Sequence, residues 1–361
     1  MRRNLLQLAA VFGFTISAIT GCSCSSSDSG GGAKRLSGGG ATFIDPIMQE
    51  WKQEYLSAKG VEIDYQAKGS GNGIQQMTEK TIDFGCSDAP MNKKQLEAAK
   101  EKGGDVIHIP LTMGPVVVAY NLPGVEKPLV FTGPVIADIY LGKIKKWNAK
   151  EIQELNKDVK LPDADIFPVY RAEASGTTNI FTEYLSKVTP EFKEKVGAST
   201  QPTWPKGVGG GERGNDGVAN RVKNSPGAIG YVELRYAIKG GLQYAAVRNK
   251  AGKDVKPTPE GVTAAAAKAM GQPQTMEPYT LHELTFSLTN AEGDESYPIS
   301  GISYGVLYKK QPAGTGKAVV DFLRWAVHDG QSFSKKLDYA PLPEELVKKI
   351  DARLNQVELG P

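Results

Sequence analysis

Four short segments of the sequence could bind an anion. Each is predicted to be a loop of small residues, with a hydroxyl or amide side chain, that leads directly into a helix, and together they cover residues 38–43, 69–73, 171–178 and 214–217. Unpaired backbone N–H groups at a helix start, together with the helix dipole, favour a bound anion. Arg171, in the third segment, adds a guanidinium fork that suits a tetrahedral oxyanion. The pattern predicts an oxyanion site.

Each of these segments also has a simpler explanation. Ser, Thr and Asn before a helix are common N-caps whether or not a ligand is present. The glycine-rich stretch 207–217 lacks the Gly-Lys-Ser/Thr ending of a nucleotide P-loop, so we exclude that kind of nucleotide binding. Four such segments in one chain favour a shared anion site, but their spacing leaves the identity of the anion open.

The composition of the 361-residue chain argues against several other classes of protein. The formal net charge is +3, and without the first 21 residues 41 basic residues face 40 acidic ones, which argues against general nucleic-acid binding. The three histidines, His108, His282 and His328, lie far apart, so a zinc site is not expected. Three cysteines are too few for a disulfide scaffold.

The N-terminus reads as an export signal with a lipid anchor. Arg2 and Arg3 precede an apolar run at 5–20, which is too short to span a bilayer as a helix. The run ends in Thr-Gly-Cys22, which resembles a bacterial lipobox, so residues 1–21 are predicted to be cleaved and Cys22 to be acylated. The Ser- and Gly-rich residues that follow, to about 34, read as a flexible tether. An ordinary secretory signal with an incidental cysteine is the alternative.

The other two cysteines allow two interpretations. Cys24 lies in the predicted tether, whereas Cys86 lies in an apolar segment. A bridge between them is open, but we favour Cys86 as a small buried hydrophobic residue.

Strands and helices are expected to alternate along the rest of the chain, which predicts an α/β fold. Strands are expected at 61–65, 107–120, 166–170, 228–232 and 302–308. Helices are expected at 46–58, 73–79, 135–141, 149–155, 178–187, 218–222, 317–327 and 343–354, with a further, exposed helix at 261–270.

Six motifs in a fixed order carry a resemblance to a known family. They are Gly-Ala-Thr-Phe at 40–43, Gly-Ser at 69–70, Asp-Phe-Gly-Cys-Ser-Asp-Ala-Pro at 83–90, Asp-Ile-Tyr-Leu-Gly-Lys-Ile-Lys-Lys-Trp at 138–147, Arg-Ala-Glu-Ala-Ser-Gly-Thr at 171–177 and Gly-Ala-Ile-Gly-Tyr-Val-Glu at 227–233. From about Leu36 to the C-terminus the chain resembles the phosphate-binding proteins of bacterial ABC phosphate importers.

The resemblance implies a two-lobed periplasmic binding protein of type II, with two α/β domains joined by a two-segment hinge. One lobe would hold residues 35–112 and 302–361, and the other residues 117–297, with the hinge near 113–116 and 298–301. Such proteins close around their ligand by hinge motion.

The resemblance also implies which residues contact phosphate. Matched to the family's motifs, they are Thr42, Phe43, Ser70, Asp88, Arg171, Ser175, Gly176 and Thr177. Without the family, Asp88 could be a turn or helix cap, and Arg171 could form a surface ion pair with Glu173. The family more often has Asp-Gly where this chain has Glu173 and Ala174, which leaves the affinity open because Ala tolerates positive φ less well than Gly.

The function implied is extracytoplasmic binding of inorganic phosphate and its delivery to the permease and ATPase of an ABC importer in the inner membrane. The protein would be a lipid-anchored monomer in the periplasm or at the cell surface, with no cofactor, metal or catalytic residue. The alternatives are binding of sulfate, molybdate or a phosphonate, and a phosphatase that reuses the anion pocket. A hydrolase would need a nucleophile with a nearby base, and no histidine lies close to Ser70 or Ser175 in the sequence.

Overall fold

The fold was taken from a computed structural model, which describes residues 34–272, 274, 279, 281 and 283–360. The predicted signal peptide, most of the tether, Cys22, Cys24 and His282 lie outside the described residues. No helix among the described residues is both long and apolar enough to cross a lipid bilayer.

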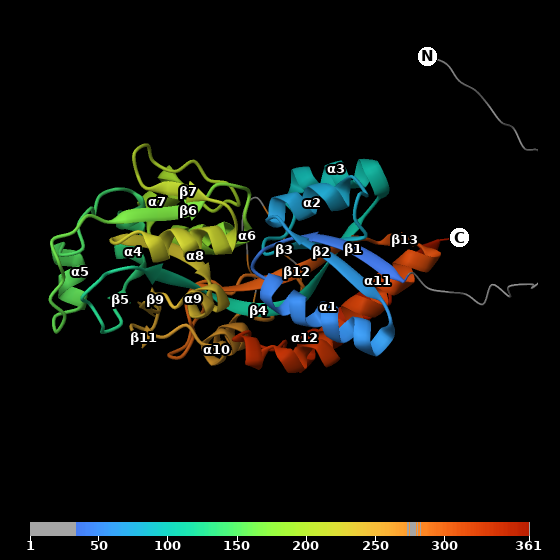
Figure 1. The fold of residues 1–361 in the computed structure, drawn as a ribbon. Coiled ribbons are helices and arrows are strands. Elements are labelled where there is room, and N and C mark those ends of the chain that lie inside the picture. The colour runs from blue at the N-terminus through green and yellow to red at the C-terminus, as the bar shows by residue number, and fades with distance from the viewer. Residues whose placement is uncertain (1–33, 273, 275–278, 280, 282, 361) are drawn as a thin grey trace, which may run out of the picture. The chain divides into compact units, whose positions relative to one another are not determined.

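A mixed sheet runs through the described residues (Figure 1). Its strands pair in the order β2, β1, β3, β12, β4, β8, β6, β7, and β9 also pairs with β4. Their bounds, in that order, are Glu62–Ala67, Arg35–Gly40, Phe84–Ser87, Ser300–Tyr308, Val106–Tyr120, Ala228–Glu233, Phe167–Arg171, Gly210–Glu212 and Gln243–Tyr244. The predicted strands at 61–65, 107–120, 166–170, 228–232 and 302–308 are confirmed, with shifted ends.

The long strand β4 joins two halves of this sheet. Its first part, Val106–Pro115, pairs antiparallel with β12, and its second part, Val116–Tyr120, pairs antiparallel with β8. We call the part with β1, β2, β3 and β12 the first half, and the part with β6, β7, β8 and β9 the second half. The predicted lobe and hinge boundaries stay a prediction, but strand pairing changes partner at Pro115 and Val116.

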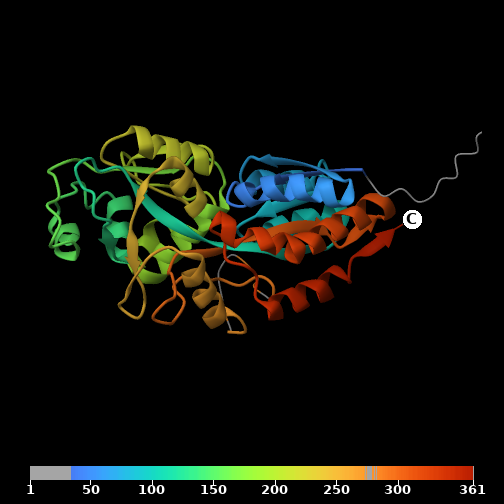
Figure 2. The same ribbon diagram turned by 60° about the horizontal axis from the view of Figure 1, so that its bottom comes forward.

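Helices cover both faces of the first half. Helices α1 (Asp45–Lys59), α11 (Ala313–Val327) and α12 (Glu344–Leu354) lie on one face, and α2 (Ser70–Thr78) and α3 (Lys93–Gly103) lie on the other (Figures 1 and 2). On the face with α1, aromatic side chains pack between the helices. The ring centroid of Tyr55 from α1 lies 5.1 Å from that of Phe322 and 5.2 Å from that of Trp325, both on α11. Helix α3 was not predicted, because its sequence, KKQLEAAKEKG, is highly polar.

Alternating side chains of β8 anchor a helix layer on each face of the second half. Ala228 and Val232 pack with α8 (Gly214–Asn224) and α9 (Leu234–Gly240). Tyr231 points to the opposite face, where its ring stacks 4.2 Å from Phe181 of α6 (Gly176–Val188). Helix α4 (Gly133–Tyr140) packs on that same face through Tyr140.

The remaining elements are short helices, 3-10 turns and two small sheets outside the main sheet. They are the helices α5 (Lys150–Leu155), α7 (Pro190–Lys195) and α10 (Pro259–Ala269), the 3-10 turns η1 (Asp329–Phe333) and η2 (Lys335–Leu337), the small sheet β11–β10–β5 (Asp254–Val255, Ala246–Arg248, Val130–Phe131) and the pair β13–β14 (Lys310–Pro312, Glu358–Gly360).

Two sequence predictions were wrong. The glycines of segment 38–43 are not a loop but the end of strand β1, where they allow close packing: a Cβ on Gly38 would lie 2.3 Å from the Phe84 ring. The helix predicted as exposed at 261–270 is half-buried, because Val262, Ala265 and Ala266 of α10 pack into the core.

Candidate anion-binding site

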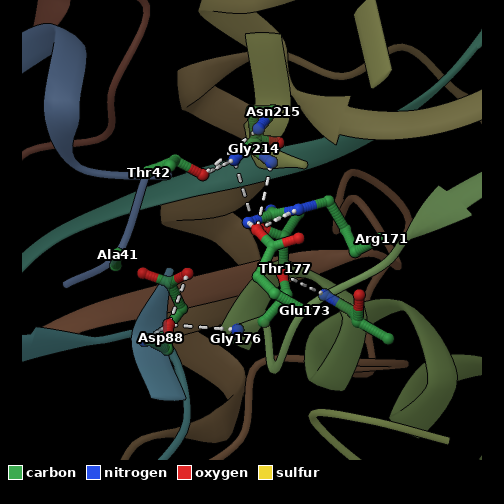
Figure 3. A network of polar contacts seen from close by, with 12 residues as sticks. Ala41, Thr42, Asp88, Arg171, Glu173, Gly176, Thr177, Gly214 and Asn215 are labelled. Carbon is green, nitrogen blue, oxygen red and sulfur yellow. Dashed lines mark hydrogen bonds and ion pairs between the residues drawn. The ribbon is translucent and has the colours of Figure 1, made fainter. Parts of the chain in front are cut away.

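The four segments predicted to bind an anion meet where the two halves of the sheet face each other. Thr42 and Phe43 precede α1, Ser70 begins α2, Gly176 begins α6 and Gly214 begins α8. Hydrogen bonds join the segments of the first half to those of the second. Figure 3 shows Thr42 and Asp88 facing Arg171, Glu173, Gly176 and Asn215 across this junction.

Asn215 connects two threonines that belong to opposite halves. Its Nδ2 donates to Thr42 Oγ1 at 2.8 Å and to Thr177 Oγ1 at 3.2 Å, and its backbone N–H donates to Thr42 Oγ1 at 3.3 Å. All three side chains are buried. Tyr236 adds a further link between the halves by donating its hydroxyl to the Thr42 carbonyl at 2.7 Å.

Ser70 and Asp88, both from the first half, make a second set of hydrogen bonds at the junction. The Ser70 Oγ accepts from the backbone N–H of Gly176 at 3.0 Å and of Asp88 at 3.2 Å. The Ser303 hydroxyl donates to one Asp88 carboxylate oxygen at 2.7 Å, and the Ser70 hydroxyl lies 3.4 Å from the other. A Cβ on Gly176 would lie 2.5 Å from the Asp88 Cβ, so this close approach requires glycine.

Asp88 is a buried carboxyl group and not the cap that its neighbours in sequence allowed. The side chain that caps α3 is that of Asn92, while Asp88 accepts from hydroxyl groups. Burial raises the pKa of Asp88 to about 7, and the Ser303 hydroxyl and the charge of Arg171 oppose that rise. The ligand-free site therefore exchanges a proton near neutral pH.

Arg171 forms a buried ion pair, so the alternative of a surface pair is wrong. It sits at the end of β6 with a side chain that is 1% exposed, and its Nε donates to Glu173 Oε1 at 3.0 Å, with Nη2 on the same oxygen. Its Nη1 lies 3.5 Å from Thr177 Oγ1. The guanidinium is thereby held with Nη1 toward the hydroxyls of the site.

Glu173 ties the arginine to a helix start. The same Oε1 accepts from the Gly214 N–H at 3.0 Å. Burial alone would raise the pKa of Glu173, but Arg171 and this N–H outweigh burial and hold the pKa below its ordinary value. The longer carboxylate thus still reaches Arg171. Ala174 is not among the residues with positive φ, so it causes no strain of that kind, and its carbonyl accepts from the Gly71 N–H at 3.0 Å.

The other two residues that the resemblance proposed are also at the junction. Phe43 has a fully buried side chain in the core, and its carbonyl accepts from the Tyr339 hydroxyl at 2.6 Å. Ser175 caps α6 by accepting from the Thr178 N–H at 3.2 Å. The structure therefore places all eight predicted residues at or next to the ends of β3, β6, α1, α2 and α6. Their role toward a ligand remains a proposal.

Sequence reasoning did not name Asn215, Tyr236 or Ser303 as residues of this network. Asn215 lies in one of the four predicted segments, so a signal existed, but the resemblance did not include it. Ser303 lies on β12, more than two hundred positions after Asp88, and no local pattern marks it. A register shift between Ser303 and Tyr304 interrupts the pairing of β12 with β4 beside the site.

A cavity and a buried thiol lie near the site. A cavity of about 600 Å³ adjoins Thr42, Glu173 and Gly214, and its lining includes the polar side chains of Lys68 and Arg213. Among the described residues, no group of three His, Cys, Asp or Glu side chains is placed to hold a metal ion. Cys86 is a buried free thiol whose pKa is raised by burial, as expected of a small hydrophobic residue.

Comparison with known proteins places the chain in a family. A family model described as a PBP superfamily domain matches residues 25–329. The phosphate-binding protein PstS of Xylella fastidiosa (strain 9a5c) is 42% identical over 321 residues, which cover 88% of this chain and 84% of that protein. PstS of Pasteurella multocida is 43% identical over 324 residues, which cover 89% and 90%.

Solved structures agree on the fold. The crystal structure of a phosphate-binding protein from Stenotrophomonas maltophilia aligns with a TM-score of 0.68 at 18% identity, covering 89% of this chain and 94% of that one. The fold is that of a two-lobed periplasmic binding protein. Within that class, the chain belongs to the family of PstS phosphate-binding proteins.

Proposed function

We propose that this protein binds inorganic phosphate outside the cytoplasm and delivers it, as a monomer without enzymatic activity, to the permease and ATPase of an ABC importer. The observation that carries the proposal is the placement of a buried arginine, Arg171, and a buried carboxyl group, Asp88, on opposite sides of a junction lined by hydroxyl and N–H donors. The two relatives described above are named phosphate-binding proteins, which supports the same ligand.

The donor and acceptor types match phosphate. Arg171, the hydroxyls of Thr42, Ser70, Ser175 and Thr177, and the N–H groups at the helix starts can donate to anionic oxygens. Near neutral pH phosphate retains a P–OH group, which can donate to ionised Asp88. Sulfate carries no proton there and would press a bare oxygen against the carboxylate, which is an unpaired like-charge contact.

Equilibrium dialysis of the stripped protein against radiolabelled phosphate tests the proposal. A single saturable site per chain that excess unlabelled phosphate empties is the expected result, and the absence of saturable uptake would refute it. A parallel assay with a generic phosphate ester separates binding from hydrolysis. Sustained release of phosphate that Arg171→Ala abolishes would favour the phosphatase instead.

We further propose that Cys22 carries a lipid anchor. Replacing Cys22 with Ala should release the protein from the membrane fraction, because a lipoprotein is held by its acyl chains. Cys24→Ala, two positions along in the same segment, is the matched control and should stay membrane-bound. Mass spectrometry of the mature N-terminus provides the check, and a wild-type protein that begins elsewhere without an acyl chain would contradict the anchor.

Ligand should favour the closed arrangement of the two lobes, with 113–116 and 298–301 acting as the hinge. Thr42, Ser70 and Asp88 belong to one predicted lobe and Arg171 and Thr177 to the other, so a ligand can contact both sets only when the lobes are together. Small-angle X-ray scattering should show a smaller radius of gyration with phosphate than with sodium chloride at equal ionic strength. An unchanged profile at saturation would count against the hinge.

A further inference from the structure

Two hydroxyl groups of the site have their lone pairs occupied by N–H donors. The Thr42 Oγ1 receives both the side-chain Nδ2 and the backbone N–H of Asn215, at 2.8 and 3.3 Å. The Thr177 Oγ1 receives Nδ2 of the same asparagine at 3.2 Å and faces Nη1 of Arg171 at 3.5 Å. A hydroxyl has one hydrogen and two lone pairs. The bond left to each threonine is therefore the one that its own hydrogen donates.

The orientation of the Asn215 amide is fixed by a third contact. The backbone N–H of Glu233, the last residue of β8, donates to Asn215 Oδ1 at 3.0 Å. Because an N–H group must meet an acceptor, the amide oxygen has to face β8 and the NH₂ group has to face the two threonines. Asn215 is fully buried, so water does not compete for these bonds.

We propose that Asn215 is a positioning residue that makes Thr42 and Thr177 act purely as hydrogen-bond donors toward the bound anion. It acts through the two threonines and does not itself need to touch the ligand. The proposal rests on the proposed phosphate-binding function. It adds that the threonines cannot accept from a P–OH group, which leaves the proton of the ligand to Asp88 and so orients the bound phosphate.

The bond from Asn215 to Thr42 also makes the donor-only role of Thr42 depend on the two halves coming together. Thr42 precedes α1 in the first half of the sheet, whereas Asn215 lies on α8 in the second half. The Thr42 hydroxyl is therefore restricted to donating only when the halves are together, whereas Thr177 lies on the same side as Asn215. The donor set becomes complete on closure.

A double-mutant cycle tests the proposal through phosphate affinity measured by calorimetry. Asn215→Leu removes the side-chain donor to both threonines at similar size and without adding charge, and leaves only the longer backbone contact to Thr42. It should weaken phosphate binding by roughly 10- to 100-fold, as expected for two impaired hydrogen bonds to a charged ligand. In a Thr42→Val, Thr177→Val background the same change should cost less than about 3-fold, since its partners are gone. Equal losses in both backgrounds would overturn the proposal.

A second variant guards against a failure of Asn215→Leu to fold, because leucine leaves the Glu233 N–H unpaired. Asn215→Asp keeps an acceptor for that N–H but presents a carboxylate oxygen to the threonines, which would turn their hydrogens away from the ligand. It should lose at least about 100-fold in phosphate affinity while its ligand-free unfolding stays cooperative. A loss under about 3-fold in this variant would also overturn the proposal.

Two controls separate this inference from the proposed function. Asn224→Ala, at the exposed end of the same helix, should bind phosphate like wild type. A wild-type protein that fails to bind phosphate would refute the proposed function itself. Normal binding by wild type together with near-normal binding by Asn215→Leu would refute the positioning role alone.

Discussion

Replacing Asp88 with Asn is expected to let sulfate into the site. Ionised Asp only accepts hydrogen bonds, so wild type should favour phosphate, which can donate, over sulfate, which cannot. Sites that require one hydrogen bond discriminate against analogues lacking it by roughly 10⁴–10⁵-fold. The Asn side chain offers an N–H to a bare sulfate oxygen, so most of the preference for phosphate over sulfate should disappear. Calorimetric titration of both anions into each protein measures the ratio.

The pH dependence gives this prediction a second readout. Burial raises the pKa of Asp88 to about 7, so the folded ligand-free protein holds a proton there that the unfolded chain releases at lower pH. The stability that this group contributes is present below its unfolded pKa and is lost as the pH rises toward 7. At about pH 8 the ligand-free Asp88→Asn protein should have a higher melting temperature than wild type. The difference between the two melting temperatures should be smaller at about pH 5.

The exposed Asp105 supplies the matched control for both measurements. Its side chain is 72% exposed, so Asp105→Asn should leave both the anion preference and the melting temperature unchanged. An Asp88→Asn protein that excludes sulfate as strongly as wild type would show that Asp88 does not select the ligand. A wild-type protein that binds sulfate as well as phosphate would instead move the other oxyanions ahead as candidate ligands.

Replacing Arg171 with Ala is expected to cause the largest loss of phosphate affinity. Truncating one partner of a buried charge contact costs about 2–5 kcal/mol, mostly through faster dissociation. Here the loss is aggravated because Glu173, now without its buried partner, would present an uncompensated carboxylate beside the anion. Stopped-flow measurement of phosphate release should show the increase in the dissociation rate.

Two further variants sharpen the interpretation of Arg171. Adding Glu173→Gln to Arg171→Ala should recover part of the affinity, because the unpaired carboxylate is neutralised. Arg213→Ala removes an exposed arginine at the adjoining cavity and should act mainly on the association rate, since exposed charges steer ligands more than they hold them. Near-normal affinity in Arg171→Ala would show that neutral donors and helix starts are sufficient.

Local sequence patterns predicted the elements that are regular and amphipathic. The β-branched run inside β4 is typical of a strand buried on both faces, and the structure places it there. The glycines of β1 were misassigned because glycine usually marks loops, whereas here it is close packing against Phe84 that requires them. The polar helix α3 was missed because it buries little beyond Ala99.

The site was predictable where its residues lie in contiguous motifs. Arg171, Ser175, Gly176 and Thr177 fall within seven positions, so the resemblance could name them together. Ser303 reaches Asp88 only through the tertiary pairing of β12 with β3, the strand that ends just before Asp88, and no single-sequence pattern encodes that pairing. The two contacts of Asn215 likewise depend on tertiary structure, because α8 must meet both α6 of its own half and the segment before α1 of the other half.

Calorimetric titration of the delipidated, ligand-stripped wild-type protein with phosphate and, separately, with sulfate tests the central claim most directly. Both titrations should be run at about pH 8, where Asp88 is mostly ionised in the ligand-free protein. We predict saturable binding of phosphate at a single site and no measurable heat of binding from sulfate at the same concentrations. Equal binding of the two anions, or no binding of phosphate, would contradict the account.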